Sequence, residues 1–194
     1  MDTTEYPHRE RQRVLLTGLL PDISTDPAIE TATDSVEAGR SGTIVAPVGI
    51  RPPLLAAVAT RAATPLVVLT ATGRDAETLT NALASWIPGV AMLPAWETLP
   101  HERLSPQVDT MARRIAVLRR LVHPVAGDES AGPISVLVVP IRAFLQPIIS
   151  GLADLEPVRV RTGDILDLTE TTNRLAELGY ERVDMVEGRG QMSV

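Results

Sequence analysis

The fold of this 194-residue chain is decided by residues 65–94, PLVVLTATGRDAETLTNALASWIPGVAMLP. Pro65–Ala71 and Val90–Pro94 are short, continuously apolar runs, which are typical of strands buried on both faces of a sheet. Between them a helical pattern begins near Asp75, and its apolar face consists of Ala76, Leu79, Leu83 and Trp86. Strand, helix and strand in this order predict an α/β fold with a parallel sheet flanked by helices.

The same alternation continues on both sides of this stretch. Thr43–Val48, TIVAPV, predicts a buried strand, and the segment RPPLLAAVATRAA after it predicts a helix with prolines in its first turn. Downstream, Ile134–Pro140 predicts a strongly β-branched strand, which a short helix through Phe144 follows. We therefore expect residues 43–150 to form one α/β domain.

A further helix is predicted after the strand at 90–94, with Ser105 as its N-cap and Pro106 at its first position. Its predicted core stripe is Val108, Met111, Ile115, Leu118 and Val122. Its basic residues are Arg113, Arg114, Arg119 and Arg120. One interpretation is a surface that faces DNA or another anion. A solvated helix face is favoured, because arginines opposite a core stripe are expected on any amphipathic helix.

Residues 1–42 are predicted to be a leader or linker that is partly disordered. Arg11–Leu20 could form a short amphipathic helix, which Pro21 is expected to end. The stretch that follows is acidic and rich in Thr and Ser, with no basic residue before Arg40. This composition predicts a solvated linker.

Residues 151–194 have a different pattern. Val158–Asp164 alternates like a half-exposed strand, Asp167 begins a helix that Gly179 ends, and Tyr180–Glu187 alternates again. The inward residues of this helix are predicted to be Leu168, Leu175 and Leu178. The pattern predicts a small α+β unit that begins here and is incomplete, so that the C-terminus resembles a truncation.

An aromatic residue with nearby arginines marks this last unit. Tyr180, Arg182 and Arg189 lie on its final predicted strand and turn. Tyrosine and arginine are enriched at protein interfaces, which predicts a contact surface for a partner protein. An ordinary sheet face is the alternative.

The composition excludes several kinds of chemistry. The chain has no cysteine and no lysine, so disulfides, thiolate metal sites and Schiff bases are impossible. The formal net charge of −6 argues against a general nucleic-acid binder. Neither a membrane span nor a signal peptide is predicted, and the absence of cysteine fits a cytoplasmic protein.

A phosphate loop would be expected at Val48–Leu55, between the first predicted strand and its helix. That loop needs several glycines and a lysine. The segment offers Gly49 as its one glycine, with Arg51 and Pro52 where the cradle should continue. We predict a degenerate, non-functional phosphate loop, no nucleotide hydrolysis and no cofactor.

Other candidate sites are weak. His101 and Glu102 with nearby Asp109 have no second histidine at ligand spacing, so neither a catalytic role nor a metal site is predicted. Trp96 is predicted to anchor its long loop, with partner binding as a secondary interpretation. The alternative function is a small α/β enzyme or nucleotide-binding protein with a site around Gly49, Thr72, Gly73 and Trp96.

Three blocks carry a family resemblance that covers about Gly42–Val194. They are LPAWETLPHERLSP at 93–106, VVPIRAFLQP at 138–147 and ELGYERVDMVEGRGQMSV at 177–194. In this order they resemble the N-terminal, UvrB-like region of the bacterial transcription-repair coupling factors (Mfd). The resemblance implies that residues 43–150 are a degenerate copy of the UvrB ATPase-like domain 1a.

Residues 151–194 resemble the start of domain 2, which in this family binds the damage sensor UvrA. The resemblance therefore implies that Tyr180, Arg182 and Arg189 contact UvrA. The damage-gripping hairpin of UvrB has no counterpart after the strand at 90–94. Contacts with RNA polymerase and DNA, and ATP-driven translocation, are implied only for parts of the family's proteins that this chain lacks.

Overall fold

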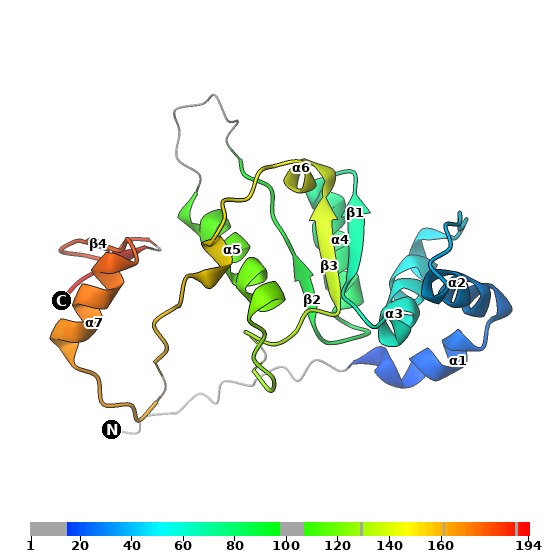
Figure 1. Ribbon diagram of the computed structural model, residues 1–194, viewed down its shortest axis with the longest axis horizontal. Helices are drawn as coiled ribbons and strands as arrows, with labels where there is room; N and C mark the ends of the chain where they lie inside the picture. Colours follow the sequence, from blue (N-terminus) through cyan, green and yellow to red (C-terminus); the bar gives the residue numbers. More distant parts are fainter. Residues whose placement is uncertain (1–14, 98–106, 129, 161, 189) are drawn as a thin grey trace, which may run out of the picture.

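The structure is a computed structural model that describes residues 15–97, 107–128, 130–160, 162–188 and 190–194 (Figure 1). Its centre is a parallel sheet of three strands, in the order β1 (Leu66–Thr70), β3 (Val136–Pro140) and β2 (Val90–Met92). Every residue of β3 is buried, as expected for a central strand of a parallel sheet. The predicted α/β fold and these three strands are confirmed.

Helices pack on both faces of the sheet, although Val67 and Leu69 of β1 remain 51% and 47% exposed. Val136 and Val138 pack with α3 (Arg51–Arg61) and α4 (Gly73–Leu83), in a core that includes Ala56, Ala76 and Leu83. The alternate residues, Leu137 and Val139, face the other core, which holds Val117 of α5 (Val108–Val122) and Ala143 of α6 (Ile141–Phe144). This alternation follows from the period of two along a strand.

The N-terminal segment is helical and packed, so the prediction of a solvated linker is wrong for residues 16–37. A short 3-10 turn, Leu16–Leu19, leads into α1 (Leu20–Ser24) and α2 (Pro27–Glu37). Ile29 and Ala32 of α2 pack against Leu54, Ala57 and Val58 of α3. Pro21 lies in the first turn of α1 instead of ending a helix, because a first-turn residue has no intrahelical N–H bond to lose.

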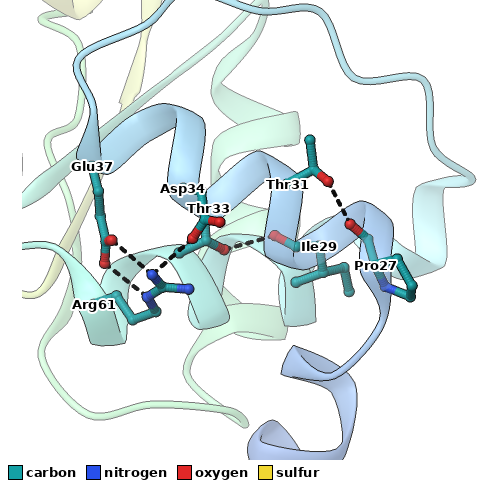
Figure 2. Close-up of polar contacts among 7 residues, drawn as sticks. All are labelled: Pro27, Ile29, Thr31, Thr33, Asp34, Glu37 and Arg61. Atoms are coloured by element: carbon teal, nitrogen blue, oxygen red, sulfur yellow. Dashed lines mark hydrogen bonds and ion pairs between the residues drawn. The ribbon is translucent and has the colours of Figure 1, made fainter.

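The acidic residues of this segment have structural partners. The Asp26 carboxylate accepts from the backbone N–H of Ala28 at 2.8 Å and caps α2. The Arg61 guanidinium of α3 donates to Glu37 at 2.7 Å and to Asp34 at 2.9 Å (Figure 2). Asp34 and Glu37 therefore connect α2 to α3, which the acidic composition alone could not show.

The predicted strand at Thr43–Val48 is also absent. The segment runs outside the sheet, Val45 is 96% exposed, and a 3-10 turn at Val48–Ile50 precedes α3. Pro47 has no N–H for a ladder hydrogen bond, which weakens this apolar run as a strand. Among the described residues, β1 pairs with β3 alone.

The C-terminal unit lies beyond α5, at the opposite end of the molecule from α1 and α2 (Figure 1). It holds α7 (Leu168–Glu177) and two short parallel strands, β4 (Glu181–Arg182) and β5 (Gln191–Met192). Asp167 caps α7 by accepting from the N–H of Glu170 at 2.8 Å, as predicted.

Three predictions for this unit are wrong. The described part of Val158–Asp164 contains no strand, and only Glu181–Arg182 of the predicted strand at 180–187 is one. No residue of α7 is fully buried, and the predicted inward position is wrong for Leu168, which is 65% exposed, whereas Leu175 and Leu178 are half-buried. A segment of alternating polarity forms a strand only where a neighbouring strand pairs with it, and β4 pairs with only two residues of β5. Among the described helices, none is both long and apolar enough to cross a bilayer.

Candidate functional site

The carboxyl edge of the sheet is the usual ligand site of an α/β domain. In this chain residues 93–97, the described part of the loop after β2, contact the segment that follows β3. The Trp96 backbone is held on both sides by Gln146, which accepts from its N–H at 2.8 Å and donates to its carbonyl oxygen at 3.3 Å. The predicted role of Trp96 as a loop anchor is confirmed.

Arg114 is the most buried large side chain in this region, at 1% exposure. Its guanidinium lies over the Trp96 ring, 4.5 Å from the ring centroid, and donates to the Pro94 carbonyl oxygen at 2.6 Å. Burial lowers the pKa of Arg114 from its ordinary value. A solvated helix face is therefore wrong for this residue.

The buried face of α5 differs from the predicted stripe. It consists of Thr110, Arg114, Val117 and Leu118. Of the predicted stripe only Leu118 is buried, whereas Val108 and Val122 are 47% and 58% exposed. The apolar pattern did not predict this face because its central residue is an arginine. The Arg114 guanidinium contacts Trp96 and Pro94 of the preceding loop. Ser105 and Pro106, the predicted helix start, lie outside the described residues.

Glu97 completes this anchored loop. It accepts a short hydrogen bond from Thr110 of α5, and its backbone carbonyl accepts from Arg142 at 3.1 Å. Burial opposes ionisation of Glu97, but hydrogen bonds from Thr110 and from backbone N–H groups outweigh it and lower its pKa. Most of the polar groups described at this edge are thus engaged with one another, although the buried Nε of Arg114 has no hydrogen-bond partner.

Other residues of the alternative nucleotide site either form local hydrogen bonds or lie in an exposed turn. Thr72 caps α4, accepting from the Asp75 N–H at 3.1 Å and donating to the Asp75 carboxylate at 2.7 Å. Gly49 lies in the exposed 3-10 turn before α3, and Arg51 is exposed. Pro52 stands in the first turn of α3, where it removes one of the N–H donors that a phosphate would need.

Of the three acid–base candidates, the structure describes only Asp109. His101 and Glu102 lie outside the described residues, and Asp109 pairs with Arg113 at 2.7 Å. Within the described ranges, no group of three His, Asp or Glu side chains could hold a metal ion.

The predicted contact residues lie in the C-terminal unit. Tyr180 is 41% exposed and Arg182 is exposed, while Arg189 lies outside the described residues. The structure adds Met185 and Val186, which are 74% and 51% exposed and which alternation alone assigned to a sheet. We call residues 180–186 the β4 segment.

Backbone hydrogen bonds fix this β4 segment at three points. Tyr180 donates to the Leu175 carbonyl at the end of α7, at 3.0 Å. Glu181 donates to Gly190 at 2.8 Å, and Val183 donates to Met192 at 2.9 Å. The side chains of Tyr180 and Arg182 are therefore presented from a hydrogen-bonded stretch of backbone.

Comparison with known proteins gives the family. A transcription-repair-coupling factor from Mycobacterium bovis is 46% identical over 154 residues, which are 78% of this chain. The chain is homologous to a segment of the transcription-repair-coupling factors. The protein of that name from Mycobacterium tuberculosis matches to the same extent, and the one from Escherichia coli is 26% identical over 140 residues, 71% of the chain.

This homology covers a small part of each transcription-repair-coupling factor. The chain spans about 12% of the length of these relatives. No protein-family model matches the chain. The predicted family is confirmed, and the activities of the much longer relatives belong to those whole proteins.

Proposed function

We propose that this chain is a non-catalytic recruitment module of a transcription-repair-coupling factor, which attracts UvrA to lesions that stall RNA polymerase. The homology to proteins of that name over 78% of the chain carries this proposal. Contacts with RNA polymerase and DNA, and ATP-driven translocation along DNA, are assigned to the rest of the longer protein. Such a module works in the bacterial cytoplasm.

The β4 segment supports a protein-binding role. It combines a half-exposed tyrosine, an exposed arginine and the exposed apolar side chains Met185 and Val186. Aromatic residues, methionine and arginine are the side chains enriched at interface cores. We assign Tyr180, Arg182 and Arg189 as UvrA contacts, with residues 43–150 as the rigid base.

Contacts between α5 and the connector to the C-terminal unit support this division of roles. His123 at the end of α5 lies 2.7 Å from the Asp154 carboxylate, and Arg119 donates to the Leu155 carbonyl oxygen at 3.2 Å. The backbone of Gly190 approaches the Val108 side chain closely enough that a Cβ there would lie 3.1 Å from it. The base therefore constrains the position of the binding unit.

Retention of UvrA on the immobilised chain tests the assigned surface. Arg182→Glu with Arg189→Glu reverses two charges of the proposed contact, and we expect UvrA retention to be lost. Arg174→Glu with Arg74→Glu is the matched control, because it makes the same charge change at exposed positions outside the β4 segment. Unchanged retention by the Arg182/Arg189 variant removes these residues from the site.

Calorimetry with ATP, GTP and dinucleotides tests the non-catalytic assignment. We expect no saturable binding, because Pro52 removes a helix N-terminal donor and the chain has no lysine for a phosphate loop. Saturable nucleotide binding that Thr72→Ala or Trp96→Ala weakens would instead support the alternative site at the carboxyl edge of the sheet.

A further inference from the structure

An open pocket of about 470 Å³ lies where α5 meets the connector to the C-terminal unit. The α5 wall includes Ala116, Arg119 and His123, and the connector wall includes Val158 and Arg159. The loop after α5 closes a third side. A volume of this size is typical of small-molecule sites.

The side chains that line this pocket carry a local excess of positive charge, although the chain has a net charge of −6 and Asp154 and Glu156 adjoin the pocket. Arg119, Arg120 and Arg159 line it, together with His123, whereas Asp128 is the one carboxylate among the lining residues. Grouped cations raise the local concentration of anions. Arginine also offers a fork of donors that matches phosphate and carboxylate groups.

Two of these guanidinium groups have only distant acidic neighbours. Arg159 lies 3.6 Å from Asp128, and Arg119 lies 3.7 Å from Glu156. Both distances exceed the usual 2.7–3.2 Å range of an N–H···O hydrogen bond. The other oxygen of Asp128 is used by its own loop, where it accepts from Ser130 and Ala131. Arg119 also donates through Nη1 to the Leu155 carbonyl oxygen at 3.2 Å. Its Nη2 group and the Nη1 group of Arg159 are therefore the donors that can turn to an incoming oxyanion.

The remaining wall is apolar. Ala116, Ala131, Pro157, Val158 and Val160 line it. A bare inorganic ion would leave this wall in contact with water, whereas an organic anion would bury its hydrocarbon part there. The pocket is suited to a charged head group on an apolar body.

We propose that this pocket binds a small organic anion, with a phosphate or carboxylate head held by Arg119 and Arg159. Because these two arginines belong to α5 and to the connector, the bound anion bridges both elements and restrains the C-terminal unit against the α/β domain. The pocket does not depend on the proposed UvrA role, since it includes no residue of the β4 segment.

Titration of the 194-residue chain by ¹H–¹⁵N NMR tests this proposal, with phenyl phosphate and benzoate as the probes. We expect saturable shifts at Ala116, Ala131 and Val158 with at least one probe. Tighter binding of phenyl phosphate indicates a phosphate ligand, and tighter binding of benzoate a carboxylate ligand. Equal affinity for neutral benzyl alcohol would overturn the assignment of an anion site.

Two variants test the residues. Arg159→Gln should weaken probe binding about tenfold, equivalent to about 1.4 kcal/mol. Ala116→Glu keeps every arginine but adds a carboxylate at an exposed position of the pocket wall, and it should abolish binding. Arg113→Gln, also on α5 but outside the pocket, is the control. Absence of saturable shifts, or equal affinities for the Arg159 and Arg113 variants, contradicts the proposal.

Discussion

Removal of the Arg114 side chain should destabilise the α/β domain far more than removal of its neighbour Arg113. In Arg114→Ala, Trp96 loses the guanidinium 4.5 Å from its ring centroid, and the Pro94 carbonyl loses a donor at 2.6 Å. A desolvated cation–π contact contributes about 2 kcal/mol. A hydrogen bond from a charged donor contributes about 1.5–3 kcal/mol.

The cost of burying the guanidinium offsets part of this gain. We therefore expect Arg114→Ala to lower the free energy of unfolding by about 3 kcal/mol, which is the sum of the two lost contacts less the relieved burial cost. Arg113→Ala removes an exposed ion pair with Asp109 and should cost about 0.5 kcal/mol or less.

Urea unfolding followed by tryptophan fluorescence and by circular dichroism measures both variants. A double-mutant cycle with Trp96→Leu isolates the ring contact, for which we expect a coupling energy of about 1–2 kcal/mol. If Arg114→Ala and Arg113→Ala have the same stability, or if the coupling is zero, Arg114 does not hold the loop through Trp96.

Other predictions concern the N-terminal helices and the anchored loop. Ile29→Ala should lower the free energy of unfolding by about 2 kcal/mol, because Ile29 packs against α3 and is only 8% exposed. Val36→Ala is the control and should have little effect, because Val36 is 45% exposed. Equal losses of stability in urea unfolding would mean that α2 is not docked on α3. Arg61→Ala should cost about 1 kcal/mol or less, and a melt in high salt should remove the difference, since the ion pairs with Asp34 and Glu37 are exposed. The pKa of Glu97 is below its ordinary value of 4.5 in the folded state, so its contribution to stability is present above that pH and is lost as the pH falls through the folded pKa. Unfolding of wild type and Glu97→Gln at several pH values should therefore show a difference that disappears in acid, and a constant difference would contradict this assignment.

The strands of the sheet could be predicted because their own residues carry the signal. Val136–Pro140 is apolar at every position and is buried at every position. The strands at 66–70 and 90–92 were predicted from the same apolar character, but burial on both faces is wrong for β1, because Val67 and Leu69 are 51% and 47% exposed. Thr43–Val48 has the same apolar character but lies outside the sheet, because an apolar run does not specify which strand it pairs with.

The errors arose where a polar residue belongs to the packed structure. Arg114 occupies the centre of the buried face of α5, so the apolar residues around it predicted a neighbouring face. The acids of α2 indicated a linker, although Arg61, which binds two of them, lies 24 positions after Glu37. Local composition could not reveal a partner so distant in the sequence.

The candidate site was predictable only in part. Tyr180 and Arg182 were identified from residue type, and the structure leaves both accessible. The exposure of Met185 and Val186 was not predictable, because alternation assigned them to a strand that ends at Arg182. The pocket beside α5 was also missed, since its walls come from segments whose contact depends on the tertiary fold.

Calorimetric titration of purified UvrA with the 194-residue chain tests the central claim most directly. We expect saturable binding with a fixed stoichiometry, and weaker binding by a chain in which Tyr180→Ser and Arg182→Glu are combined. The fold of this variant is checked by its urea unfolding curve, which should match that of the wild type because both side chains are exposed. Absence of binding, or equal affinity of the two chains for UvrA, would contradict recruitment through the β4 segment.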